Sequence, residues 1–321
     1  FVAPVPVEGL TVACVDDAGV LRLLDRLGAD RPVLRYGLSD DATLRATGIE
    51  ARGTGCRFTL EEDGRVLGVV ELAVPGLHNV RNALAAIGAA RAVGAELDAA
   101  VRALGAFGGV ARRFQRVGTA GGVVVIDDYA HHPTEIAATL EAARSAFPEH
   151  RVVAIFQPHL YTRTRDFAPA FGQALAEADV VWVCDVYPAR EAPIPGVTGA
   201  LVADAARDAG AREVHYVEDR GAVAGQVAAS LRPGDVCLTM GAGDVDEIGR
   251  VVLSILVGAA EEAHREGRAG DGRGVRADRG ARPVGVGPAR SDRRGRRRPS
   301  GSPRALAAAA AADGRVPGAA G

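Results

Sequence analysis

Residues 122–133 read GVVVIDDYAHHP, an apolar run that ends in two aspartates, two histidines and a proline. Further apolar runs follow at residues 152–156, 180–184, 214–217 and 236–240. The segments between and after them have helical patterns, at residues 133–146, 166–176, 198–209, 222–231 and 245–256. Strands that are apolar throughout are typical of a sheet covered on both faces. The pattern therefore predicts an α/β fold with a parallel, doubly wound sheet.

The region before this sheet predicts a second α/β unit. Residues 9–74 contain short strand-like runs around one helical segment, and Glu62-Asp63-Gly64 predicts the turn of a β-hairpin. Two Ala-rich helices are expected at residues 78–93 and 97–104. Gly108-Gly109 follows them as a linker. We therefore expect one domain at residues 1–110 and another at 111–260.

The last segment, residues 261–321, consists mainly of Arg, Gly, Ala and Pro, with few large apolar side chains. Such a composition cannot bury enough surface to offset the entropy of ordering, so a disordered tail is expected. A basic tail that binds anions or nucleic acid is the alternative. At the other end the chain opens with Phe1 rather than Met, which predicts a processed chain or an incomplete gene product.

The composition of the chain disfavours several classes of protein function. The net charge of −2 predicts neither a nucleic-acid nor a membrane partner, and no apolar run reaches the length of about 18 residues that a membrane span needs. The four cysteines are scattered without a CxxC pair, which predicts buried thiols in a cytoplasmic protein. All 38 Lys or Arg residues are Arg. These 321 residues therefore cannot contain a GxxxxGK[ST] phosphate loop.

Polar residues follow the carboxyl ends of four of the five predicted strands. These groups are Asp127–Pro133, Gln157-Pro158-His159 with Tyr161, Arg163 and Arg165, Asp185–Glu191, and Gly241–Asp244. Ligands of α/β sheets bind at the carboxyl ends of the strands, so a site is expected there. As alternatives, Asp127 or Asp128 could cap the next helix, and Gly241-Ala242-Gly243 is only a weak phosphate-loop signal. No further ligand lies at zinc spacing from His131-His132, so a zinc site is not expected.

Three arginines lie at positions that suggest contact with an anion. Arg163 and Arg165 lie at the start of a predicted helix, where the helix dipole disfavours positive charge, so they are expected to face an anion. Arg113, in Arg112-Arg113, follows the glycine linker at the boundary between the domains, where a guanidinium suits a phosphate.

The helix at residue 78 opens with a second polar group. His78 and Asn82 lie one helical turn apart and so face the same way. An amide can recognise adenine through paired donor and acceptor contacts. Asn79 could instead be the N-cap of this helix.

Six segments in order resemble the Mur ligases: PGLHNVRNALAA, ARRFQ, DDYAHHPTEI, FQPHLYTRTRDF, DVYPAREAPIPGVTG and MGAGD. The resemblance covers roughly residues 1–258 and is greatest to the members that join L-alanine to UDP-N-acetylmuramate. DDYAHHPTEI is also similar to the member that recycles murein tripeptide. The resemblance implies the later part of a central ATP-binding domain at residues 1–110 and a Rossmann-like C-terminal domain at 111–260.

The resemblance also implies an activity: ATP phosphorylates the muramate carboxylate, and the amine of L-alanine attacks the acyl phosphate. By resemblance, His78, Asn79 and Asn82 hold adenine, Asp128 binds the ribose hydroxyls, and Arg113 reaches the phosphates of ATP when the domains close. Tyr129, His131, His159 and Arg163 line the amino-acid and muramoyl end, with Glu191 in the same wall. The expected catalytic residues are Arg113, His131, His159 and Arg163.

Family members also carry a UDP-binding domain, the phosphate loop, and a Glu and a His that hold Mg²⁺. We expect this chain to open beyond all of these, so that it does not catalyse ligation alone. Leu160 also stands where some members have Arg. Three other functions are weighed: a nucleotide-binding module without catalysis, a dehydrogenase, and a scaffold built around the basic tail. DDYAHHP replaces the GxGxxG turn of a dehydrogenase, which disfavours that class.

Overall fold

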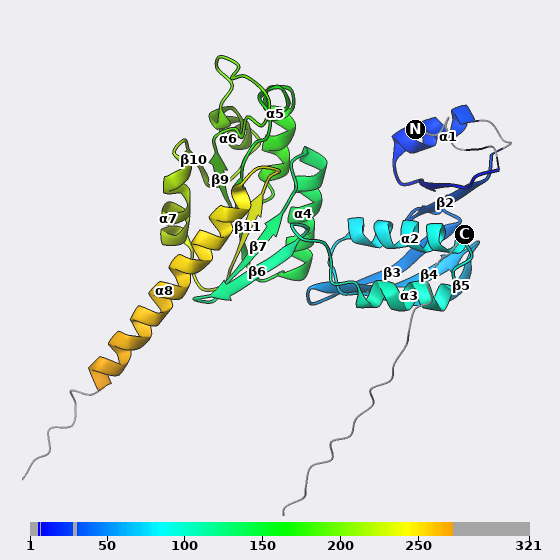
Figure 1. The fold of residues 1–321 in the computed structure, drawn as a ribbon, viewed down its shortest axis with the longest axis horizontal. Coiled ribbons are helices and arrows are strands. Elements are labelled where there is room, and N and C mark those ends of the chain that lie inside the picture. Colours follow the sequence, from blue (N-terminus) through cyan, green and yellow to red (C-terminus); the bar gives the residue numbers. More distant parts are fainter. Residues whose placement is uncertain (1–5, 7, 28–30, 272–321) are drawn as a thin grey trace, which may run out of the picture. The chain divides into compact units, whose positions relative to one another are not determined.

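The computed structural model describes residue 6 and residues 8–27 and 31–271. The described residues all belong to one compact unit. They form two sheets of five and six strands, each with its own apolar core. The predicted α/β class is confirmed (Figure 1).

The second sheet has the strand order β10-β9-β8-β11-β7-β6. Five of its strands run parallel, as predicted: β7 (Val123–Asp128), β8 (Arg151–Phe156), β9 (Val180–Cys184), β10 (Val214–Val217) and β11 (Asp235–Met240). The edge strand β6 (Gln115–Ala120) pairs antiparallel with β7 and was not predicted. Its sequence QRVGTA is largely polar because one side of an edge strand reaches solvent, which removes the apolar signal.

Helices cover both faces of this sheet (Figure 1). The first core cluster packs α4 (Pro133–Ala146), α5 (Tyr161–Leu175) and α6 (Gly199–Asp208) against one face. The second packs α7 (Arg220–Ser230) and α8 (Val245–Asp271) against the other. Successive strand residues alternate between the two clusters, so Val123 and Val125 enter one while Val124 and Ile126 enter the other.

Two predicted helices have different bounds in the structure. Helix α5 begins at Tyr161, not at residue 166, and therefore includes Arg163 and Arg165 in its first turns. Helix α8 continues to Asp271, past residue 260 where the tail was expected to begin. This extension contains Ala, Glu and Arg, which have favourable intrinsic helix propensities. Residues 272–321 of the predicted tail lie outside the described residues.

The first sheet has the order β1-β2-β3-β4-β5 and is mixed. Strands β1 (Thr11–Cys14), β2 (Val33–Gly37) and β3 (Leu44–Arg52) run parallel, and β4 (Gly55–Glu62) and β5 (Arg65–Leu72) continue antiparallel. Helix α1 (Ala18–Leu27) connects β1 to β2. The predicted hairpin is β4–β5: Asp63 and Gly64 both have positive φ, 49° and 76°, as a tight two-residue turn requires.

Helices α2 (Leu77–Ala92) and α3 (Leu97–Ala106) contribute to the core of the first sheet. Val80, Leu84 and Ile87 of α2 are buried among the strand residues Leu44, Phe58 and Val70. The apolar face of α2 therefore holds the helix, and with it the polar residues at its start, against this sheet.

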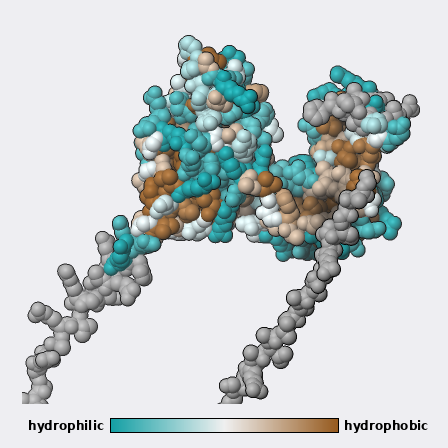
Figure 2. Space-filling model, viewed as in Figure 1, coloured by the Kyte–Doolittle hydropathy of each residue, from teal (hydrophilic) through white to brown (hydrophobic). Residues whose placement is uncertain are grey.

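The surface shows an apolar area on α8 (Figure 2). Val251, Ile255 and Val257 remain partly exposed there, by 49%, 41% and 42%. None of the helices described has the length and hydropathy to cross a bilayer.

Candidate functional site

The carboxyl ends of the parallel strands in the second sheet gather the polar residues that the sequence singled out. Asp128, Phe156 and Met240 lie in register at the ends of β7, β8 and β11. Beyond β8 and β9, His159 and Tyr187 form an isolated parallel bridge that extends this edge. The expected clustering at one edge of the sheet is therefore present in the structure.

Asp128 is fixed by the backbone around it. Its side chain is buried, and its oxygens accept hydrogen bonds from the N–H groups of Ala130 (2.7 Å) and Phe114 (2.8 Å). Burial raises the pKa of this carboxyl, and the two backbone hydrogen bonds oppose that rise. Asp128 does not cap α4. The N-cap is His132, whose ring accepts from the backbone of Thr134 at 3.4 Å.

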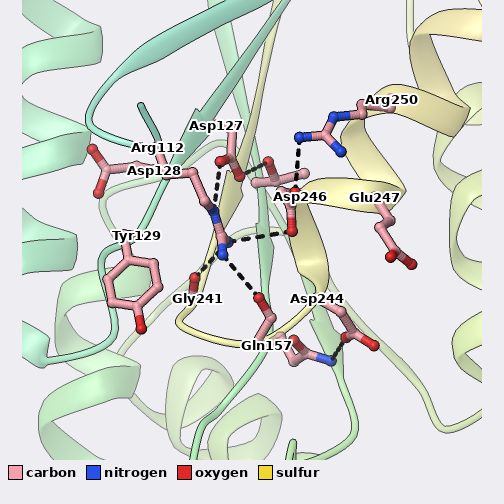
Figure 3. Close-up of polar contacts among 12 residues, drawn as sticks. Arg112, Asp127, Asp128, Tyr129, Gln157, Gly241, Asp244, Asp246, Glu247 and Arg250 are labelled. Atoms are coloured by element: carbon pink, nitrogen blue, oxygen red, sulfur yellow. Dashed lines mark hydrogen bonds and ion pairs between the residues drawn. The ribbon is translucent and has the colours of Figure 1, made fainter. Parts of the chain in front are cut away.

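Arg112 is locked inside the second domain (Figure 3). Its Nε donates to the buried Asp127 carboxylate at 3.0 Å. Its two terminal nitrogens donate to the carbonyl oxygens of Gly243 and Gly241, both at 2.9 Å. The Gly241-Ala242-Gly243 loop thus presents carbonyl groups to a guanidinium of the protein itself. This contact ties the start of the domain to β7 and to the loop after β11.

Arg113 has the opposite environment from its neighbour. Arg112 and Phe114 on either side both adopt left-handed conformations, with φ of 57° and 48°. The side chain of Arg113 is 51% exposed, and its nearest carboxylate, Glu135, lies 3.8 Å away. Its guanidinium carbon lies 5.6 Å from the centre of the Tyr129 ring. The sequence could not show which of the two arginines is more exposed, because their exposure depends on these backbone angles.

A cavity of about 720 Å³ brings together the five residues that were predicted to bind a cofactor. Apolar side chains that include Leu72, Val74 and Leu104 form much of its wall. The five predicted residues in its lining are His78, Asn79, Asn82, Arg113 and Asp128. An apolar cavity with a few polar groups is the usual form of a small-molecule site.

The start of α2 does not have Asn79 as its N-cap, which was the alternative interpretation of the sequence. The N-cap is Gly76, and Asn79 lies inside the first turn, where its amide donates to Pro75 O at 2.7 Å. Gly76 has φ of 95°, and a Cβ there would lie 2.7 Å from the His78 ring. Burial lowers the pKa of His78, and Arg113 and Arg81 lower it further. Positive charge on the His78 ring is therefore disfavoured, and the ring lies close to the backbone turn.

Four aromatic rings form a second group at the same edge of the sheet. Ring centres lie 5.3 Å apart for Tyr129 and His131, and 6.2 Å apart for His131 and His159. His159 stacks on Tyr187 at 5.6 Å. Burial lowers the pKa of His159, and the nearby Arg163 and His131 add to that effect.

The polar atoms of Arg163 and His159 contrast with those of Asp128. Arg163 Nη1 and His159 Nδ1 are buried, and no group of the described chain hydrogen-bonds to either. Glu191 lies near this group and accepts hydrogen bonds from the backbone N–H and the hydroxyl of Thr162. Arg165, which like Arg163 was expected to face an anion, pairs with the carboxylate of the adjacent Asp166 at 2.8 Å, and both side chains are 53% exposed.

Glu135 is a site residue that sequence reasoning missed. It lines the same cavity as Arg113, and its carboxylate accepts from the backbone N–H groups of His131 and His132. A glutamate three residues after an N-cap is a capping-box signal, which could have identified it. Within residues 8–27 and 31–271, His, Cys, Asp and Glu side chains form no group of three that could hold a metal ion.

Two family models match the sequence. Residues 1–90 match the Mur ligase middle domain, and residues 112–243 match the Mur ligase glutamate ligase domain. The chain belongs to the Mur ligase family. The middle-domain match covers the mixed first sheet, and the glutamate ligase domain match covers the largely parallel second sheet.

Curated Mur ligases with sequences similar to this chain are UDP-N-acetylmuramate–L-alanine ligases. The one from Mycolicibacterium smegmatis is 50% identical over 265 residues, which are 80% of this chain and 53% of that protein. The one from Salinibacter ruber is 44% identical over 256 residues, 78% of this chain and 53% of that protein. The chain therefore spans about half the length of the curated relatives it matches.

Solved Mur ligase structures are similar as well. The UDP-N-acetylmuramate-alanine ligase of Thermotoga maritima has a TM-score of 0.62 at 30% identity, over 76% of this chain and 51% of that one. A murein peptide ligase from Psychrobacter arcticus has a TM-score of 0.56 at 26% identity, over 78% of this chain and 52% of that one.

Proposed function

We propose that this chain provides the nucleotide and amino-acid sites of an enzyme that ligates L-alanine to UDP-N-acetylmuramate. The reaction makes a peptidoglycan precursor: ATP phosphorylates the muramate carboxylate, and the amine of L-alanine displaces phosphate from the acyl phosphate. The similarity to UDP-N-acetylmuramate–L-alanine ligases at 44% and 50% identity supports this choice of substrates. The proposed enzyme acts in the cytoplasm.

The nucleotide is proposed to occupy the cavity that contains His78, Asn79, Asn82, Arg113 and Asp128. This cavity is the observation that carries the proposal. Asn82 and Asn79 offer amides to the edge of adenine, and the adjacent apolar wall suits its faces. The fixed carboxylate of Asp128 accepts from the ribose hydroxyls, and the exposed guanidinium of Arg113 binds the phosphates.

The amino-acid and muramoyl groups are proposed to lie against Tyr129, His131, His159 and Arg163. Arg163 and His159 each have a buried nitrogen without a hydrogen bond to the described chain, Arg163 lies close enough to lower the pKa of His159, and both substrates contain a carboxylate. Arginine stabilises negative charge that develops during attack on the acyl phosphate. Glu191, held by Thr162, belongs to the same wall and positions the start of α5.

These 321 residues contain no lysine, so they hold no GxxxxGK[ST] loop to stabilise the transferred phosphoryl group. Mg²⁺ supplies that charge neutralisation in the family, and the described residues hold no group of three ligands that fits it. Loss of one such stabilising group costs on the order of 10²–10³ in rate. We therefore expect the chain by itself to bind ATP without ligating.

The murein tripeptide is a second candidate substrate. The similarity of this chain to the murein peptide ligase of Psychrobacter arcticus favours it. The amine component separates the two: L-alanine is a single amino acid, whereas the tripeptide requires space beyond its first residue.

Phosphate release tests the proposal. The chain is mixed with ATP, Mg²⁺, UDP-N-acetylmuramate and either L-alanine or murein tripeptide, and binding of ATP is measured in parallel. We expect ATP to bind and no phosphate release with either amine. Release that depends on both UDP-N-acetylmuramate and an amine would overturn the expectation for the isolated chain and would show which amine is used. No binding of ATP would contradict the nucleotide site.

A further inference from the structure

Glu135 contacts residues from both parts of the candidate site. One carboxylate oxygen, Oε2, accepts from the backbone N–H of His131 at 2.9 Å and of His132 at 3.2 Å. The same oxygen lies 3.3 Å from Nδ1 of the His131 ring. The other oxygen, Oε1, lies 3.8 Å from Arg113 Nη1. Glu135 therefore links the side chain proposed for the phosphates to the ring proposed for the amino acid.

Glu135 is ionised in this position. Burial by itself raises the pKa of the carboxyl, but the hydrogen bond from the His131 backbone, the His131 ring, the His132 backbone and Arg113 together lower it below its ordinary value. A carboxylate of this kind stabilises positive charge on an adjacent imidazole.

The hydrogen bonding of His131 fixes where its proton lies. Nδ1 is 2.8 Å from the carbonyl oxygen of Tyr129, and a carbonyl can only accept a hydrogen bond. The neutral ring must therefore carry its hydrogen on Nδ1, which leaves the lone pair on Nε2. The position of the Glu135 carboxylate beside the same N–H favours this tautomer as well. A carboxylate has this effect on the histidine of hydrolytic triads.

Nε2 of His131 is available for a substrate. It is the ring nitrogen farther from the main chain, and no hydrogen bond joins it to another described residue. The ring is 23% exposed and packs edge-on toward His159, whose ring centre is 6.2 Å away. His159 and Arg163 belong to the proposed amino-acid end, so the His131 ring that carries Nε2 lies at that end too.

We infer that Glu135 is a positioning residue for deprotonation of the incoming amine, holding His131 in the tautomer whose Nε2 accepts the proton. This inference rests on the proposed function. One N–H bond of the ammonium group breaks, and its electron pair stays on nitrogen as the lone pair. The proton forms a new bond to Nε2, and Glu135 stabilises the resulting imidazolium. The nitrogen lone pair then forms a bond to the acyl carbon, and phosphate leaves with the electron pair of the C–O bond. The departing phosphate takes the second proton from the nitrogen, which leaves a neutral amide, and His131 returns its proton to water.

Nitrogen-15 NMR of histidine in the full chain tests the tautomer without any turnover. The variant His131→Gln assigns the His131 signals. We expect the wild-type ring to have hydrogen on Nδ1, and Glu135→Gln to increase the share of the Nε2–H form, because Gln keeps the cap but removes the charge. Glu141→Gln changes an exposed carboxylate on the same helix and is the matched control, which should leave the spectrum unchanged. A dominant Nε2–H form in the wild type, or no change in Glu135→Gln, would overturn the inference.

Titration with L-alanine tests the role of Nε2. We expect its signal to move upfield as the ammonium group donates to the lone pair, and the shift to be smaller in Glu135→Gln. N-acetyl-L-alanine, which has no ammonium group, should produce no such shift. An unchanged Nε2 signal at saturating L-alanine would overturn the role of His131. ATP titration of the same sample separates the two proposals: absence of ATP binding contradicts the proposed function, whereas normal ATP binding with an unmoved Nε2 contradicts only this inference.

Discussion

The nucleotide end and the amino-acid end of the site differ in how their polar groups are satisfied. At the nucleotide end, Asp128 already accepts two backbone hydrogen bonds, and the guanidinium of the neighbouring Arg112 donates three hydrogen bonds within the protein. At the amino-acid end, Arg163 Nη1 and His159 Nδ1 are buried without hydrogen bonds to the described chain. A buried polar group without a partner costs about 1–3 kcal/mol. One end is therefore built for rigidity, and the other gains most from an anionic ligand.

Removal of the Arg112 side chain at the nucleotide end should have the largest effect on the free energy of unfolding. Arg112→Ala removes the guanidinium that pairs with the buried Asp127 carboxylate and donates to two carbonyl groups, and it leaves Asp127 with only the hydroxyl of Thr239 among the described residues. Removal of one partner from a buried ion pair costs about 3–5 kcal/mol, so we expect the free energy of unfolding in urea to fall by that amount. Arg165→Ala, at an exposed ion pair, should change it by less than about 0.5 kcal/mol. Equal effects of the two variants would contradict the contrast between them.

Asp128→Ala should have the next largest effect. It leaves the N–H groups of Phe114 and Ala130 unpaired, at about 1–3 kcal/mol each. Because the N–H of Phe114 is only partly buried, its contribution lies at the low end, and we expect a total loss of about 2–4 kcal/mol in unfolding free energy. Asp128→Asn keeps one acceptor oxygen and should lose about half of that. Both variants can be measured by urea denaturation. A loss in Asp128→Asn as large as in Asp128→Ala would show that charge rather than hydrogen bonding is responsible.

Arg113→Ala should leave stability nearly unchanged and weaken binding of ATP. A hydrogen bond to a charged group contributes about 1.5–3 kcal/mol, so the affinity for ATP should fall about 10- to 100-fold. Adenosine has no phosphates, and its affinity should stay the same. Calorimetry with both ligands checks this prediction. An equal loss for ATP and adenosine would mean that Arg113 acts on the base or the fold instead of the phosphates.

The smallest predicted effect is a change in the pKa of His159 at the amino-acid end. Burial and the charge of Arg163 hold the pKa of His159 below its ordinary value. Arg163→Met should therefore raise that pKa, which NMR titration can follow. Since the folded-state pKa is lowered, the stability linked to His159 is fully present above its unfolded value of about 6.5 and is lost as the pH falls through the folded value. A His159 pKa that does not rise in Arg163→Met would show that burial alone accounts for the shift.

The strands of the second sheet could be predicted because runs such as residues 123–126 are apolar on both faces. The edge strand β6 could not, because its polar residues carry no such signal. The same limit applies to the site. Asp128 and His159 were identified by their position after strands, but the separate roles of Arg112 and Arg113 depend on the left-handed turn around them. The exposed pair of Arg165 with Asp166 depends on where α5 begins, which the sequence placed too late.

The central claim is that residues from α2 and from β7 form one nucleotide site. Calorimetry with ATP on the 321-residue chain, compared with Asn82→Ala in α2 and Asp128→Asn in β7, tests it most directly. The account predicts one molecule of ATP per chain, with weaker binding in each variant while both remain folded. Binding that is unchanged in Asn82→Ala, or no binding to the wild-type chain, would contradict it.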